Sequence, residues 1–106
     1  MKPWKQLKIY LAETDHWQRQ PLYQVIVKKA RQSQLAGATV TRAIEGFGTN
    51  LQLRTANILA LSDNLPIIIT IIDDEEKIRR FYQEIKHIIV RNLVILEAVK
   101  VLQFEP

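Results

Sequence analysis

Two histidines and a few carboxylates are the side chains of this 106-residue chain that could do acid–base or metal chemistry. His16 follows Asp15 in T-D-H-W, and an Asp–His pair can act as a general base. Neighbouring residues usually point apart, so Asp15 is more simply explained as a turn residue. Glu13 and Asp15 could together face a cation, but two carboxylates alone make a poor metal site. His87 falls in a predicted helix, where a single histidine is most often structural.

The acidic run at residues 73–76 is the other group that resembles a metal site. It directly precedes a helical pattern, and acidic side chains stabilise the N-terminus of a helix. Asp73 and Glu76 have the spacing of a capping box. The sequence indicates no general base that could pair with Ser33 or Ser62. These residues therefore predict no metal site and no catalytic residue, and we expect the protein not to be an enzyme.

The stretch G-F-G at residues 46–48 could bind phosphate through its backbone. A dinucleotide fingerprint needs a third glycine before a helix, but Leu51 stands at that position. The G-K-[ST] element of a P-loop is also missing. Two interpretations stay open: a bulge where a strand leaves its sheet, with Phe47 packing, or backbone N–H groups that bind an anion or a base edge.

Hydrophobic periodicity predicts the elements that must position these residues. They are a strand over 6–13, a helix over 21–35, a strand over 38–47, a strand over 67–72, a helix over 73–89 and a last strand within 93–104. Gly37, just past the first helix, is expected to form its left-handed cap. The order predicts an α+β, ferredoxin-like βαββαβ sandwich, with two helices on one face of a four-stranded antiparallel sheet. Residues 1–106 are expected to form a single domain.

The third predicted strand, I-I-I-T-I-I, is apolar on both faces. A sheet with one solvated face should alternate apolar and polar residues. Because the helices cover only one face, we expect the other face to pack against another subunit.

Composition narrows the class of protein. The chain has no cysteine, which excludes disulfides and thiolate metal sites. Its N-terminus lacks the apolar segment of a signal peptide, and no apolar run is long enough to span a membrane. The net charge of +4 is dispersed, which argues against nucleic-acid binding. The cytoplasm is the expected location.

Several stretches in a fixed order carry a family resemblance. G-A-T-V-T-R-A-I-E-G-F-G is similar to the second strand of the PII nitrogen-regulatory proteins. D-N-L-P-I-I-I-T-I-I-D-D is similar to the segment that returns from their long T-loop. K-I-Y-L-A-E-T-D-H-W and L-E-A-V-K-V resemble the uncharacterised PII-like branch of this superfamily. The resemblance spans nearly the whole chain.

The resemblance implies a ferredoxin-like homotrimer whose sheets face inward. PII-type proteins bind adenine nucleotides in clefts between subunits, so AMP, ADP or ATP is the implied effector. They regulate a partner, such as a transporter, channel or enzyme, by moving the T-loop, which corresponds here to a mobile loop near residues 48–57. Such a loop is a two-state element that the ligand biases.

The resemblance also supplies candidate nucleotide-binding residues. Matched positions place four residues at the cleft: Thr39, Gly46, Phe47 and Gly48. We add three cations because an anionic ligand needs positive charge: Arg42, Arg54 and Lys100. Solvation at the surface explains each of these cations equally well.

The chain departs from the nitrogen-regulating PII proteins in ways that narrow the expected ligand. Residues 87–97 contain no glycine where those proteins have a glycine-rich phosphate loop. The expected loop near residues 48–57 also lacks the tyrosine that is modified in the nitrogen-regulating proteins. A smaller adenine nucleotide than a triphosphate, or none, therefore stays open. The alternatives are a CutA-like trimer with a metal-tolerance role and a small ferredoxin-like enzyme.

Overall fold

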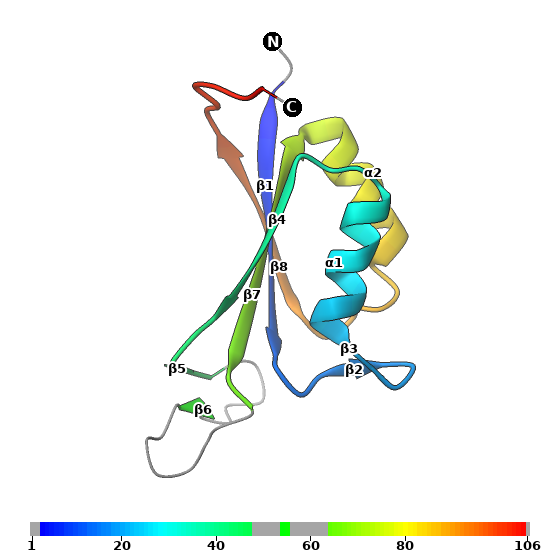
Figure 1. The fold of residues 1–106 in the computed structure, drawn as a ribbon, viewed down its shortest axis with the longest axis vertical. Coiled ribbons are helices and arrows are strands. Elements are labelled where there is room, and N and C mark those ends of the chain that lie inside the picture. The colour runs from blue at the N-terminus through cyan, green and yellow to red at the C-terminus, as the bar shows by residue number, and fades with distance from the viewer. Residues whose placement is uncertain (1–2, 48–53, 56–63, 106) are drawn as a thin grey trace.

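Two helices lie on one face of a four-stranded antiparallel sheet in the computed structural model of the chain (Figure 1). The structure describes residues 3–47, 54–55 and 64–105. The sheet strands are β1 (Trp4–Ala12), β4 (Gly37–Arg42), β7 (Pro66–Asp74) and β8 (Leu93–Val99). The helices are α1 (Leu22–Gln32) and α2 (Glu75–Ile85). Four short strands form two small ladders: β2 (His16–Trp17) with β3 (Gln20–Pro21), and β5 (Glu45–Gly46) with β6 (Arg54–Thr55).

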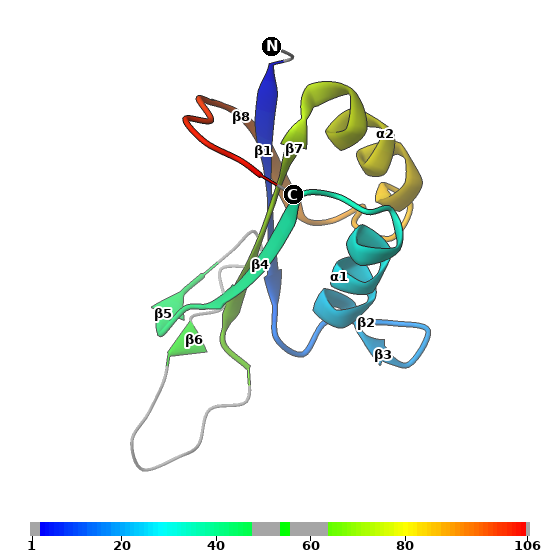
Figure 2. The ribbon, with the colours of Figure 1, turned by 45° about the horizontal axis from the view of Figure 1, so that its top comes forward.

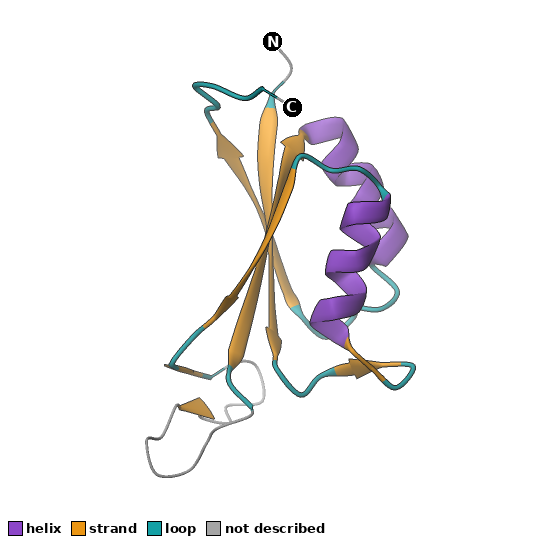
Figure 3. Cartoon of the chain, viewed as in Figure 1, coloured by secondary structure: helices purple, strands orange, loops and turns teal. Residues whose placement is uncertain are grey.

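The sheet order is β4-β7-β1-β8, with every neighbouring pair antiparallel. Figure 3 shows the resulting two layers, one of helices and one of strands. Together with the helix positions, this order confirms the predicted α+β, ferredoxin-like fold. Both helices stay on the same side of the sheet when the molecule is turned (Figure 2).

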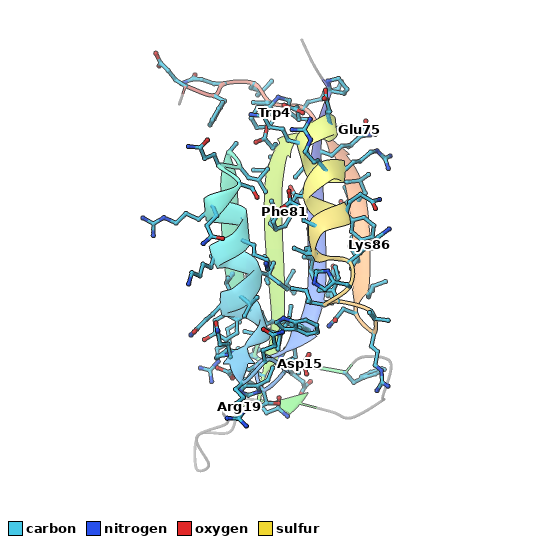
Figure 4. The ribbon with its side chains drawn as sticks, turned by 90° about the vertical axis from the view of Figure 1, so that its right-hand side faces the viewer. Trp4, Asp15, Arg19, Glu75, Phe81 and Lys86 are labelled. Carbon is cyan, nitrogen blue, oxygen red and sulfur yellow. The ribbon has the colours of Figure 1, made fainter. Side chains whose placement is uncertain are left out.

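The core lies between the sheet and the helices. The two central strands contribute alternate residues: Leu7, Ile9, Leu11, Ile67, Ile69 and Ile71. The helices contribute the predicted apolar stripes: Leu22, Val25, Ile26, Ala30, Ile78, Phe81 and Ile85. Phe81 of α2, labelled in Figure 4, is fully buried and belongs to the same core cluster as the residues of the central strands. This core fixes the face of every sheet residue, and so fixes which way the residues of β4 and β7 point where these strands reach Arg42 and Pro66.

The end of α1 differs from the prediction. Gly37 is not the helix cap, because it is the first residue of β4 and does not have a positive φ. Gln34 takes the left-handed position instead, with φ 56. The amide of Leu35 donates to Ala30 O and that of Gln34 donates to Arg31 O, as in a Schellman motif. A glycine suits position 37 because a Cβ there would lie 3.3 Å from Ile72 Cγ2.

The start of α2 lies one residue later than a capping box at Asp73 requires, so that prediction is wrong. Asp74 is the N-cap, and its side chain accepts a hydrogen bond from Lys77 N at 3.0 Å. Asp73 is instead buried at the end of β7. Its carboxylate accepts hydrogen bonds from Ala36 N at 2.9 Å and from Asp74 N at 2.6 Å. It thereby ties the α1–β4 turn to the point where β7 meets α2.

The face of the sheet away from the helices has no covering layer among the described residues (Figure 1). On β7, Ile68, Thr70 and Ile72 point to this face and are half-buried, whereas the alternate isoleucines are fully buried under the helices. The two-sided apolar character predicted for this strand is therefore present in the fold. We call this surface the open sheet face.

Candidate functional site

The candidate site lies where the chain leaves and rejoins the sheet, at one end of the molecule (Figure 1). We call these segments, residues 42–46 and 64–66, the loop base. Arg42, the last residue of β4, pairs with Ile67 of β7. One residue later, Ala43 N donates a hydrogen bond to Pro66 O at 2.8 Å. The outgoing strand is thus held against the returning strand up to residue 43.

Glu13 joins both segments of the loop base. Its Oε1 atom accepts hydrogen bonds from Arg42 Nε at 3.1 Å and from Arg42 Nη2 at 3.0 Å. The same oxygen accepts a hydrogen bond from Leu65 N at 3.2 Å. Its own backbone N–H donates to Leu65 O at 2.9 Å. The two carboxylates therefore do not face a cation together, because Glu13 pairs with the side chain of Arg42 while Asp15 accepts a hydrogen bond from Ala12 N.

Gly46 packs closely against the returning strand. A Cβ at this position would lie 3.2 Å from Pro66 Cγ. Gly46 pairs with Arg54 in the short β5–β6 ladder, and it has no positive φ. The adjacent Phe47 is 67% exposed, so it does not pack as the bulge interpretation expected. The close approach of the Pro66 ring therefore explains this glycine.

Thr39 and Arg42 lie on opposite faces of β4. Residues directly opposite in antiparallel strands share a face. Thr39 is opposite Thr70 and so points to the open sheet face, while Arg42 is opposite the buried Ile67 and points to the helix side. Thr39 is exposed. The structure thus keeps these two candidates in one strand but directs their side chains apart.

The remaining candidates are not all near the loop base. Arg54 is brought there by its pairing with Gly46. Lys100 follows the last residue of β8, which pairs with Trp4 at the other end of β1. Since Arg42 lies level with Leu11, the two rows are separated by roughly 23 Å at about 3.3 Å per residue. Gly48 lies outside the described residues.

The two histidines are held by local contacts. The ring Nδ1 of His16 hydrogen-bonds Thr14 O, and the ring of His87 lies edge-on to Trp17 with centroids 5.6 Å apart. Within residues 3–47, 54–55 and 64–105, no cluster of three or more histidine, aspartate or glutamate side chains could hold a metal ion. In the same ranges, no helix is long and apolar enough to cross a membrane.

The acidic run at residues 73–76 has structural partners throughout. Glu75 receives a hydrogen bond from Arg79 Nε at 2.7 Å and lies 3.8 Å from Lys5 Nζ. The Arg79 hydrogen bond lowers the pKa of Glu75, and the positive charges of Lys5 and Arg79 add to this. Glu76 pairs with Arg80 at 3.0 Å.

Comparison with known proteins identifies the family. The DUF190 family model, described as Uncharacterized ACR, matches residues 4–101. The chain belongs to the DUF190 family. Its relatives include a UPF0166 protein of Aquifex aeolicus (strain VF5), which is 39% identical over 100 residues that make up 92% of each chain.

Solved structures share the fold of this DUF190 chain. CPII, a nitrogen regulatory PII-like protein from Thiomonas intermedia K12 bound to ADP, AMP and bicarbonate, superposes with a TM-score of 0.72. It is 16% identical, over 95% of this chain and 90% of CPII. The divalent ion tolerance protein CutA1 from Ehrlichia chaffeensis has a TM-score of 0.61 and 12% identity, over 97% and 87% of the two chains. The predicted resemblance to a PII-like branch is thereby confirmed, and identities this low establish the fold alone.

The turn between α2 and β8 of the DUF190 chain packs into the core. Ile88 and Ile89 are 6% and 3% exposed, and Asn92 Nδ2 donates to Tyr10 O at 3.0 Å. This stretch, which the sequence showed to lack glycine, therefore presents buried apolar side chains to the core. An extended phosphate cradle cannot form there without unpacking these isoleucines.

Proposed function

We propose that this DUF190 protein is a PII-like regulatory protein. It binds an adenine nucleotide in clefts between the subunits of a homotrimer and regulates a partner protein. The observation that carries the proposal is the loop base, where Arg42, on the helix side of β4, and the closely packed Gly46 lie at the end of the strand whose Thr39 points to the open sheet face. The structural likeness to CPII, which binds ADP and AMP, supports the same ligand class.

The open sheet face supports the homotrimer. The half-buried Ile68 and Ile72 would expose apolar area to water in an isolated chain. Burial of apolar surface stabilises association by about 25 cal/mol per Å². In the proposed trimer these faces pack together, and the candidate clefts lie between neighbouring chains.

The candidate residues supply the groups that an adenine nucleotide needs. Thr39 offers an exposed hydroxyl to the base on the open sheet face, Gly46 offers backbone without a Cβ, and Arg42 contributes positive charge from the other face of the edge strand β4. The exposed ring of Phe47 can stack on the adenine. AMP or ADP is favoured over ATP because the α2–β8 turn packs into the core. The proposed set of nucleotide-binding groups also includes Gly48 and the side chain of Arg54, which lie outside the described part of the structure.

The regulated partner is a transporter, channel or enzyme, contacted through the loop near residues 48–57. That loop lies largely outside the described residues. The protein has no catalytic role of its own in this proposal and acts in the cytoplasm.

Calorimetric titration with AMP, ADP and ATP tests the proposal, together with the molar mass from light scattering. Thr39→Val should weaken nucleotide binding by about twofold to tenfold, the usual worth of one hydrogen bond. Thr41→Val is the matched control, because Thr41 is also exposed and opposite Ile68 on the same face of β4. Equal losses in both variants would contradict the role of Thr39, and failure of all three nucleotides at millimolar concentration would contradict the proposal.

The same titration with Cu²⁺ and Zn²⁺ tests the CutA-like alternative, which the fold of CutA1 keeps open. Stoichiometric binding of a divalent ion, with no response to nucleotides, would favour that alternative.

A further inference from the structure

One carboxylate oxygen carries three hydrogen bonds at the loop base. Glu13 Oε1 accepts two N–H groups of the Arg42 guanidinium and the backbone N–H of Leu65. The Glu13 side chain is 22% exposed and that of Arg42 is 50% exposed, so the pair borders solvent. Glu13 therefore links the outgoing strand, through a side chain, to the returning strand, through a backbone amide.

We propose that Glu13 and an anionic ligand compete for Arg42, and that the outcome is passed to the returning strand through Leu65. This inference rests on the proposed nucleotide function. A phosphate that approaches Arg42 meets the negative charge of Glu13 at the same guanidinium. The phosphate and the Glu13 carboxylate are both negative and repel each other when both lie beside the Arg42 guanidinium. The phosphate therefore gains its full attraction to Arg42 only as the carboxylate withdraws.

Withdrawal of the carboxylate has a consequence for the returning strand. Leu65 is 5% exposed, and a buried backbone N–H that loses its acceptor is destabilised. The neighbouring contact from Thr14 Oγ1 to Asn64 Oδ1, at 2.8 Å, lies on the same connection between residues 13–14 and 64–65. Ligand binding at Arg42 thus loosens the attachment of residues 64–65 to the end of β1. Glu13 is the positioning residue that couples the two events.

Glu13→Gln tests the coupling because it removes the charge and keeps the shape. AMP and ADP should bind this variant about tenfold tighter than the wild type, since one repelling charge near the phosphate is gone. The matched control is Glu76→Gln, which neutralises another carboxylate paired with an arginine at 3.0 Å, on the outer side of α2. In the wild type, AMP should speed hydrogen exchange at the Leu65 amide. The amide of Ala43, which donates to Pro66 O instead, should be unchanged.

Each result decides between the two proposals. Tighter AMP binding in Glu13→Gln only, with AMP-accelerated exchange at Leu65 in the wild type, supports the coupling. Unchanged or weaker binding in Glu13→Gln overturns the competition while leaving the nucleotide function in place. An equal gain in Glu76→Gln shows that net charge alone is responsible, which also overturns it. If no nucleotide binds any of the three proteins, the proposed function and the competition both fail.

Discussion

Two adjacent aspartates at the end of β7 should respond very differently to the same substitution. Asp73 is 3% exposed, and its two carboxylate oxygens accept backbone N–H groups from Ala36 and Asp74. Asp74 is 8% exposed, and its side chain accepts one N–H, that of Lys77. Changing either residue to asparagine removes one negative charge and preserves the size of the side chain. The main difference between the two variants is therefore the number of backbone N–H groups that the native carboxylate accepts.

The magnitude follows from the number of acceptors. In Asp73→Asn, the amide oxygen can accept one N–H, and the amide NH₂ must face the other donor. One charge-assisted hydrogen bond, worth about 1.5–3 kcal/mol, is lost, and one N–H is left buried without an acceptor. We expect the free energy of unfolding to fall by about 2–4 kcal/mol. In Asp74→Asn it should change by less than about 0.5 kcal/mol, because asparagine and aspartate are nearly equivalent N-caps.

Urea unfolding of both variants and the wild type, at pH 7 and one fixed protein concentration, measures the difference. The fixed concentration matters because the proposed assembly would contribute to the apparent stability. Amide exchange should also speed up at Ala36 in Asp73→Asn, and stay slow there in Asp74→Asn. Equal losses of stability in the two variants, or a larger loss in Asp74→Asn, would refute the assignment of Asp74 as the cap and Asp73 as the buried acceptor.

Two further predictions concern charge and assembly. Arg79→Gln should raise the pKa of Glu75 toward its ordinary value, followed by carboxyl ¹³C NMR; an unchanged titration would contradict the assigned contact. Because the pKa of Glu75 is lower in the folded state than in the unfolded state, ionised Glu75 stabilises the fold at pH values above the unfolded pKa. This stabilisation is lost as the pH falls through the folded pKa. Ile72→Lys, on the open sheet face, should reduce the mass of the proposed trimer in light scattering to that of a monomer, whereas Gln83→Lys, on the exposed side of α2, should not. A wild-type monomer at micromolar concentration would contradict the trimer.

Hydrophobic periodicity was enough to predict the layers of this fold. The residues at alternate positions of β1 and at helical spacing in α1 are those that the structure buries. Periodicity works here because burial against one common core imposes it on every element. The boundaries were less accurate: the predicted strand over 38–47 divides into β4 and β5, and the helix over 73–89 begins two residues later.

Predictions from the sequence were wrong where the backbone takes a left-handed conformation. Gln18, Arg19 and Gln34 have φ values of 49, 69 and 56. Glycine and asparagine are the usual signals for this conformation, and none of the three residues is either. The hairpin turn between β2 and β3, which lies between the predicted strand over 6–13 and the predicted helix over 21–35, was therefore not predicted, and the helix cap was assigned to Gly37. The pairing of Trp17 with Gln20 and the backbone hydrogen bonds that end α1 hold these residues in a backbone conformation that their type does not favour.

The central contact of the loop base could not be predicted from spacing. Glu13 is 29 residues from Arg42 and 52 residues from Leu65 in the chain. The pairing of β7 with both β1 and β4 brings the three together, and that pairing depends on the whole sheet. Sequence reasoning selected Arg42 for its charge and named Glu13 as a carboxylate that could face a cation, but it could not pair the two residues. The roles of Thr39 and Gly46 in ligand binding stay predictions.

The position of Lys100 connects the predicted site to the predicted assembly. Within one chain, Lys100 lies beyond the end of β8 that pairs with Trp4, whereas the loop base lies at the opposite end of the sheet. One ligand of nucleotide size cannot reach both, because the rows are roughly 23 Å apart at about 3.3 Å per residue. If both contact one nucleotide, Lys100 must come from a neighbouring subunit. Lys100→Gln should then weaken nucleotide binding only in the assembled protein. Added to the monomeric Ile72→Lys variant, it should not weaken nucleotide binding any further. A Lys100→Gln variant that forms trimers and binds AMP as the wild type does would remove Lys100 from the site.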